Sequence, residues 1–191
     1  YYITNLIDSF DFSFHNGKLS ADQRRGIINL IPKPDKDPFF LKNWRPISLL
    51  NTDYKLLTKC IANRLKIVLP DIIHSDQTGF LPGRYIGENV RLALDMIDYL
   101  NKNDLPGLMF LIDFRKAFDK IEWSFILKSL TFFNFGPDLI KWVKVIYTDI
   151  SSCVINNGNS SSFFNLGCGV RQGCPLSPLL YIICSEVLSS Y

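Results

Sequence analysis

Two features that this sequence lacks limit what the protein can be. The chain holds only two histidines, and its five cysteines include no C-x-x-C pair. An odd number of cysteines argues against a secreted disulfide framework and favours a reducing compartment. Zinc-ligand spacing is also absent. We therefore expect the cysteines to behave as small buried hydrophobic residues.

Long apolar runs are missing as well. The longest strongly apolar stretch, Leu179 to Cys184, is far shorter than the ~20 residues that cross a bilayer. No charged and then apolar leader opens the chain, which argues against a secretory signal. The chain begins at Tyr1 rather than Met and stops at Tyr191 within an apolar helical pattern, so we expect a piece of a longer protein.

What is present favours a globular domain with a basic side. Hydrophobic residues make up 47% of the 191 residues and charged residues 20%, which excludes a disordered chain. Residues 24–91 hold twelve Lys and Arg against six Asp and Glu, whereas residues 92–191 hold eight against nine. A basic part joined to a slightly acidic part is typical of a polyanion-binding protein, although basic surfaces are also common as simple solvated faces.

The first half of the chain predicts two strands followed by helices. Apolar and β-branched residues predict strands over residues 26–31 and 44–50, and Pro46 places the second strand at an edge or bulge. The polar stretch 51–53 offers cap chemistry for an amphipathic helix that Pro70 should close. The Gly- and Pro-containing segment 76–84 predicts a loop, and helical spacing returns over residues 86–100.

The second half interleaves strands and helices without a strict βαβ period. Five consecutive apolar residues at 108–112 predict a strand buried on both faces. Helical spacing covers residues 123–133, 139–147 and 175–188, and Asn157-Gly158 between two short apolar runs predicts a hairpin. These patterns favour an α+β fold.

Three short motifs offer functional side chains. Asp113 follows the predicted buried strand in LIDFRKAFDKIEW, where a carboxylate either holds a divalent cation or caps the next turn. Gln172 precedes a Gly-Cys-Pro turn in GVRQGCPLSPLL and either contacts a sugar or base edge or faces water. Arg45 lies in the basic half and either grips a phosphate or is an ordinary surface arginine.

Five motifs follow one another as INLIPKP, NWRPISLLNTDYKLLTKCIANRL, QTGFLPGR, LIDFRKAFDKIEW and GVRQGCPLSPLL. In this order they resemble the reverse transcriptase of non-LTR (LINE-type) retrotransposons, from about Gly26 to the end of the chain. Group II intron maturases share the outline, but WRPISLLNTDYK and DFRKAFD are closer to the retrotransposon branch.

The resemblance implies a right-hand polymerase and its partners. Residues 1–23 would form an N-terminal flank, residues 24–107 the fingers, and residues 108–191 a partial palm with inserted fingers-side helices and a hairpin. The implied activity is RNA-directed DNA polymerisation, in which a DNA primer is extended on an RNA template from deoxynucleoside triphosphates with two Mg²⁺ ions. The resemblance also implies an endonuclease domain elsewhere in the parent polyprotein, no membrane association, and an intracellular location in cytoplasm and nucleus.

The resemblance also implies roles for residues near the predicted strand at 108–112. Asp113 matches the aspartate that holds both catalytic Mg²⁺ ions, and the backbone carbonyl of Phe114 matches a further metal ligand. Phe118 matches the aromatic gate under the sugar, where a ring leaves no room for a 2′-hydroxyl, the atom that distinguishes RNA from DNA. Asp119 is not carried over and is interpreted as serving the local turn or helix.

The remaining matches concern nucleotide and template. Arg45 matches the fingers arginine on the incoming triphosphate, Lys33 matches a second phosphate contact, and Gln172 matches the glutamine near the nucleotide sugar. The residues that match a segment along the template are Gln77, Gly79 and Arg84.

One departure from the family pattern concerns the second metal-binding element. In the family, a hairpin with aromatic-Ala-Asp-Asp follows the GVRQGCPLSP helix, yet no Asp-Asp dipeptide occurs in this sequence. The chain ends before that hairpin and before the thumb. Because two-metal catalysis needs carboxylates from both elements, we expect these 191 residues to be inactive alone. The alternative interpretation is a catalytically silent nucleic-acid-binding remnant of a retroelement.

Overall fold

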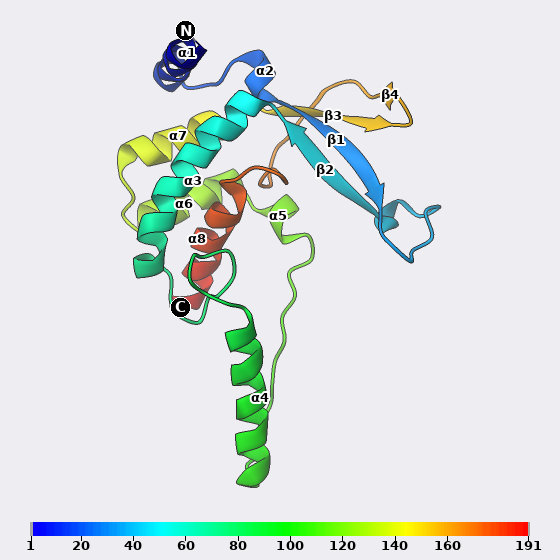
Figure 1. Ribbon diagram of the computed structural model, residues 1–191, viewed down its shortest axis with the longest axis vertical. Helices are drawn as coiled ribbons and strands as arrows, with labels where there is room; N and C mark the ends of the chain where they lie inside the picture. Colours follow the sequence, from blue (N-terminus) through cyan, green and yellow to red (C-terminus); the bar gives the residue numbers. More distant parts are fainter. Residues whose placement is uncertain (1, 191) are drawn as a thin grey trace.

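The computed structural model describes residues 2–190 and has a mixed α+β fold (Figure 1). Its elements are α1 (Tyr2–Asn16), α2 (Ala21–Arg24), β1 (Arg25–Pro32), a 3₁₀ turn (Leu41–Asn43), β2 (Trp44–Leu50), α3 (Thr52–Ile72), α4 (Gly87–Lys102), α5 (Ala117–Lys120), α6 (Trp123–Phe132), α7 (Pro137–Tyr147), β3 (Ser151–Asn156), β4 (Asn159–Ser160), β5 (Phe164–Asn165) and α8 (Ser177–Ser189). The predicted α+β class is confirmed.

The sheet is built on β1, which pairs antiparallel with β2 and parallel with β3. Its order is β2-β1-β3-β4, and β5 also pairs with β3. The predicted strands at 26–31 and 44–50 are both confirmed. β2 is the outer strand, which suits Pro46 because proline has no N–H to donate to a further neighbour.

The predicted hairpin after β3 is also present. Asn157 and Gly158 have φ angles of +50° and +77°, the left-handed backbone that a tight two-residue hairpin turn requires. β3 and β4 then pair antiparallel through Ile155–Ser160 and Asn156–Asn159.

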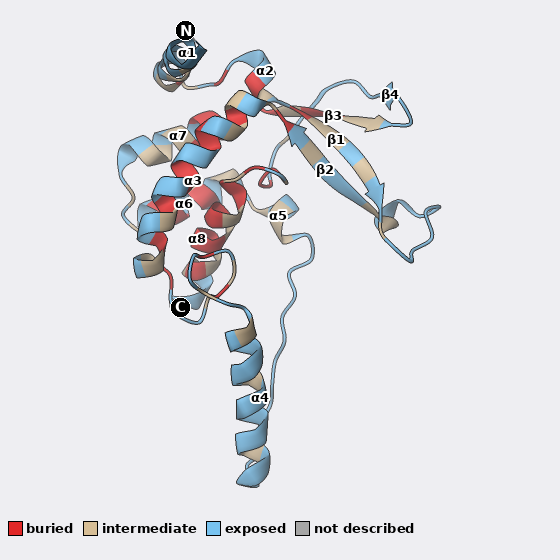
Figure 2. Cartoon of the chain, in the orientation of Figure 1, coloured by how far each residue is buried: buried red, intermediate tan, exposed pale blue. Residues whose placement is uncertain are grey.

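A helical body packs beside the sheet and contains most of the core. Buried apolar side chains come mainly from α3, α6, α7 and α8 (Figure 2). The Asn51 side chain caps α3 by accepting from the Asp53 N–H at 2.8 Å, as the cap chemistry predicted. The helices predicted at 123–133, 139–147 and 175–188 correspond to α6, α7 and α8.

The prediction that Pro70 closes α3 is wrong. The helix continues to Ile72, and the Ile73 N–H donates to the Leu69 carbonyl at 2.9 Å. A proline removes only its own N–H from the ladder, so a neighbouring bond can carry the last turn past it.

The prediction of a strand buried on both faces at 108–112 is also wrong. Leu108 and Leu111 are 91% and 86% exposed, and the segment has no strand partner among residues 2–190. It runs beside α4 as an exposed connection that projects from the body (Figures 1 and 2). An apolar run becomes a buried strand only where neighbouring strands bind its backbone groups and cover its faces.

The prediction that the cysteines are buried holds for three of the five. Cys153, Cys174 and Cys184 are buried, whereas Cys60 and Cys168 are exposed, and all five are free thiols. Within the described range, helices long and apolar enough to cross a membrane are absent.

Candidate nucleotide and nucleic-acid site

Phe118 is held in an aromatic cluster between α5 and α8. Its half-buried ring packs edge-on against Tyr181 with ring centroids 4.9 Å apart. On its other side the ring of Phe80 lies 6.3 Å away. Contacts from two other segments therefore hold the ring that the resemblance names as the sugar gate.

The GVRQG turn lies directly against the segment that carries Phe118. The Val170 N–H donates to the Phe118 carbonyl, and the Gly169 N–H donates to the Ile121 carbonyl, both at 2.7 Å. The Gln172 amide Nε2 donates to Asp119 Oδ1 at 3.1 Å. The fold thus brings together Phe118 and Gln172, which lie more than fifty positions apart in the sequence.

Asp119 contributes more than the local turn or helix that the sequence predicted. Its carboxylate orients the Gln172 amide, and its backbone leaves no space at Gly169, where an added Cβ would lie 2.8 Å from the Asp119 carbonyl oxygen. Gly169 also has φ of +85°, a conformation that glycine adopts without strain.

Arg171 anchors the same turn to the sheet from the buried side. Its Nη2 donates to the carbonyl of Arg24 at 2.7 Å, and its guanidinium lies 5.0 Å from the centre of the Tyr54 ring. Burial is the main reason that the pKa of Tyr54 is raised well above its usual value. An added Cβ at Gly26 would lie 2.9 Å from Arg171 Nη2, so this glycine leaves the space that the arginine occupies.

A cavity of about 340 Å³ lies where these parts meet. The sheet, α5 and the GVRQG turn bound it. The residues that line it include Ile28, Pro46, Ser48, Asp119, Ser152 and Gln172. A cleft with a few placed polar groups suits a small polar ligand.

Asp113 and Phe114 lie on the exposed connection before α5. Both side chains are exposed, and the described part of the chain contains no group of three or more His, Cys, Asp or Glu side chains that could hold a metal ion. Mg²⁺ takes six oxygen ligands in near-octahedral geometry. One carboxylate and one backbone carbonyl supply only part of such a shell, so a Mg²⁺ ion at Asp113 would need further ligands.

Arg45 and Lys33 lie at the far end of the β1–β2 hairpin. Arg45 is exposed on the outer strand, in register with Ile31 of β1. Lys33 Nζ donates to the Lys42 carbonyl at 2.9 Å and so ties the base of the hairpin loop together. The hairpin projects away from the helical body in Figure 1.

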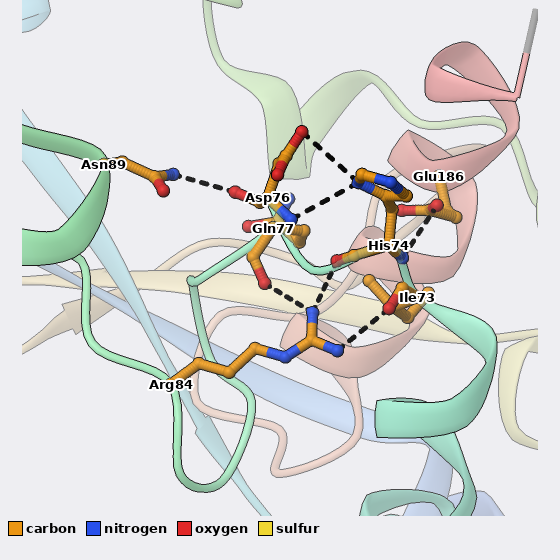
Figure 3. Close-up of polar contacts among 7 residues, drawn as sticks. All are labelled: Ile73, His74, Asp76, Gln77, Arg84, Asn89 and Glu186. Carbon is orange, nitrogen blue, oxygen red and sulfur yellow. Dashed lines mark hydrogen bonds and ion pairs between the residues drawn. The ribbon is translucent and has the colours of Figure 1, made fainter. Parts of the chain in front are cut away.

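Gln77, Gly79 and Arg84 lie in the loop between α3 and α4, and Figure 3 shows Gln77 and Arg84. The Gln77 side chain accepts from the Gly79 N–H at 2.9 Å. Arg84 donates to backbone carbonyls of its own loop and of α3. The side chains of Gln77 and Arg84 in this predicted template segment therefore make hydrogen bonds within the protein.

The sequence reasoning missed Arg171 and Glu186. Arg171 is only 4% exposed and Glu186 only 6%. For Glu186 a signal was available, because it is the one charged residue in the otherwise apolar pattern of α8.

Comparisons with known proteins identify the family of this chain. The family described as "Reverse transcriptase (RNA-dependent DNA polymerase)" matches residues 31–190. The chain is 38% identical over 174 residues to the "Transposon TX1 uncharacterized 149 kDa protein" of Xenopus laevis, with 91% of this chain and 13% of that protein covered. It is 31% identical over 162 residues to the "RNA-directed DNA polymerase from mobile element jockey" of Drosophila funebris, with 82% and 17% covered. The chain therefore spans less than a fifth of the length of these relatives.

A solved structure shares the fold. The apo telomerase of Candida tropicalis, truncated from its C-terminal domain, superposes with a TM-score of 0.55 at 15% identity, covering 98% of this chain and 44% of that chain. At this identity the similarity concerns the fold alone. Because the family match extends over most of the sequence and the relatives include retrotransposon proteins, this chain belongs to the reverse transcriptase family and is related to the enzymes of non-LTR retrotransposons.

Proposed function

We propose that this chain forms the fingers and upper palm of the RNA-directed DNA polymerase of a non-LTR retrotransposon. Residues 24–107 would be the fingers, residues 108–191 part of the palm of a right-hand polymerase, and residues 1–23 a flank. The parent protein would act inside the cell, extending a DNA primer on RNA, and would carry an endonuclease domain elsewhere.

The observation that carries the proposal is that the segment of Phe118 and the turn that carries Gln172 are hydrogen-bonded to each other. The two residues come from different motifs, and the hydrogen bonds between the Phe118 segment and the GVRQG turn keep these segments together. This arrangement supports a nucleotide site in which Phe118 excludes a 2′-hydroxyl and Gln172 meets the sugar. Arg45 and Lys33 would bind the triphosphate from the hairpin.

Asp113 would be a ligand of Mg²⁺ in the parent enzyme. In the complete parent protein, Asp113→Asn should abolish primer extension on RNA, because losing several kcal/mol of metal stabilisation lowers the rate on the order of a thousandfold or more. The matched control is Asp98→Asn, an exposed aspartate of α4. Near-normal extension by Asp113→Asn would contradict the role of Asp113.

Sugar selection provides a second test. Phe118→Val in the parent enzyme should admit ribonucleotides, because the ring is the barrier to the 2′-hydroxyl. Side-by-side incorporation of deoxy- and ribonucleotides measures this, and unchanged discrimination would leave Phe118 as a packing residue.

A second candidate function is a silent nucleic-acid-binding remnant. It would keep the basic residues of 24–91 and bind nucleic acid without polymerising. Both candidates predict that the 191-residue chain binds RNA with an affinity that falls as salt rises, because residues 24–91 carry a basic excess. Primer extension by the complete parent protein separates them, since the remnant would bind RNA without synthesising DNA.

A further inference from the structure

The loop between α3 and α4 is held in a defined conformation by buried side chains and hydrogen bonds. Thr78 and Leu81 are each only 5% exposed, so the loop inserts two side chains into the protein. Asn89 at the start of α4 donates from Nδ2 to the Asp76 carbonyl at 2.8 Å (Figure 3). The loop is thus held at several points, and its exposed parts have defined positions.

Arg84 makes the largest set of contacts in this loop. Its Nη2 donates to the carbonyls of Pro70 and Ile73 at 3.0 and 2.9 Å, and its Nη1 donates to the carbonyl of Gln77 at 2.8 Å and to that of His74. The Pro70 carbonyl belongs to the last turn of α3, whose carbonyls lack partners within the helix and carry the negative end of its dipole.

These four bonds occupy the guanidinium. An arginine has five N–H donors, and four carbonyls already face its two terminal nitrogens. A two-pronged contact with a phosphate needs a pair of these donors on one side of the fork. Arg84 therefore has no free fork to offer to nucleic acid in this conformation.

Glu186 connects the same loop to α8. Its carboxylate, 6% exposed, accepts from the His74 N–H at 3.0 Å. A buried carboxylate needs such a donor, because an unpartnered charge away from water is strongly unfavourable. The loop is accordingly tied to the helix that also carries Tyr181, the neighbour of Phe118.

One of the side chains that the loop exposes is the ring of Phe80, which also lies beside Phe118. This side chain is 61% exposed and its φ is +61°, which is unusual for an aromatic residue and requires support from its surroundings. Its ring lies 6.3 Å from that of Phe118. An exposed aromatic face beside a nucleotide site is suited to stacking on a base.

We propose that Arg84 is a positioning residue that holds this loop, and that the loop meets nucleic acid through the Phe80 ring and not through the Arg84 guanidinium. This inference rests on the proposed function. It gives Arg84 a positioning role in place of a direct template contact.

The salt dependence of RNA binding by the full chain separates the two roles of Arg84. A phosphate contact contributes about 0.7 to the log–log slope on single-stranded nucleic acid, so its loss would make the slope shallower by that amount. As a positioning residue, Arg84→Gln should weaken binding several-fold and leave the slope unchanged. Arg84→Lys should behave like Arg84→Gln, because a lysine point charge cannot bridge four carbonyls. A shallower slope in Arg84→Gln with binding restored by Arg84→Lys would overturn the proposal.

Hydrogen–deuterium exchange without nucleic acid tests the positioning role independently of function. Both Arg84 variants should speed exchange of the amides in residues 74–84. The matched control is Arg64→Gln, an exposed arginine of α3, which should leave that exchange unchanged. Unaltered exchange in the Arg84 variants would overturn the positioning role. Failure of Arg84→Gln to fold would support it, because an exposed phosphate contact is not needed for folding.

Phe80 carries the binding half of the proposal. Phe80→Leu should weaken RNA binding roughly tenfold with no change of slope, since base stacking on an aromatic ring is lost while charge is kept. Phe80→Tyr should restore it. Normal binding by Phe80→Leu would overturn the Phe80 contact. If the unmodified chain binds no RNA, the proposed function and the Phe80 contact both fail, while the exchange experiment still decides the role of Arg84.

Discussion

Helices α3 and α4 have similar sequence patterns and opposite surroundings. Both repeat apolar residues at helical spacing, yet α3 buries seven side chains and α4, as far as the structure describes it, buries none. α3 packs against α8, whereas α4 projects from the body with the exposed segment 108–112 beside it (Figure 2). Amphipathic spacing therefore establishes that a helix forms, but burial requires a second surface to cover its apolar face.

Substitutions at matched leucines should show the largest difference between the two helices. Leu65 of α3 is 3% exposed and Leu94 of α4 is 56% exposed. Leu65→Ala should lower the free energy of unfolding by about 2–5 kcal/mol, because it leaves a cavity in the core. Leu94→Ala should change it by about 0.5 kcal/mol or less. Urea unfolding measures both, and equal losses would mean that α4 is buried in solution.

The contact of the sheet with the GVRQG turn should be the next most sensitive point. Gly26→Ala would place a Cβ against Arg171, Ser152 and Leu50, at 2.9 to 3.3 Å. Such overpacking should lower the free energy of unfolding by about 1–3 kcal/mol. Gly167→Ala is the control, because nothing lies within 4 Å of its added Cβ. A neutral Gly26→Ala variant would show that the turn is not packed on β1.

Alkaline pH should destabilise the helical body, because it contains the buried thiol of Cys184. Burial raises the pKa of Cys184 in α8 to about 11, above the usual value of 9.0. The folded state thus holds this proton more tightly, and its contribution to stability is present below pH 9 and is lost as pH rises toward 11. Between pH 8 and pH 10 the loss should be about 1 kcal/mol.

The matched variant isolates this thiol from other titrating groups. Cys184→Ala should show a smaller decline of unfolding free energy over the same pH range. Thiol labelling at pH 8 should modify the exposed Cys60 and Cys168 and spare Cys184. Rapid labelling of Cys184 in the folded chain would contradict its burial.

The smallest effect is expected on the projecting helix. Arg91 Nε lies 2.9 Å from Asp95 Oδ1, and both side chains are mostly exposed. Asp95→Asn should change the free energy of unfolding by about 0.5 kcal/mol or less, because water and salt screen such a pair. Thermal unfolding at two salt concentrations checks this, and a larger change would indicate that the pair is shielded from solvent.

Local chemistry in the sequence was sufficient to predict much of the fold. Apolar runs bounded by proline and polar residues predicted β1 and β2, Asn51 predicted the start of α3, and Asn157-Gly158 predicted the β3–β4 turn. Each of these features depends on residues close together in the chain. For the site, the motifs identified Phe118 and Gln172 through a family resemblance, and the structure brings their segments together.

Only the tertiary structure decided the features that depend on distant partners. The run at 108–112 has the composition of a buried strand, but in residues 2–190 no strand lies beside it. The family resemblance predicts Arg84 in a segment along the template, whereas in the fold its guanidinium donates to the carbonyls at the end of α3. Arg171 gave no local signal, since its partners Arg24 and Tyr54 are more than a hundred residues away. A sequence pattern specifies what a side chain can bind, and the chain's path through space determines which partner it meets.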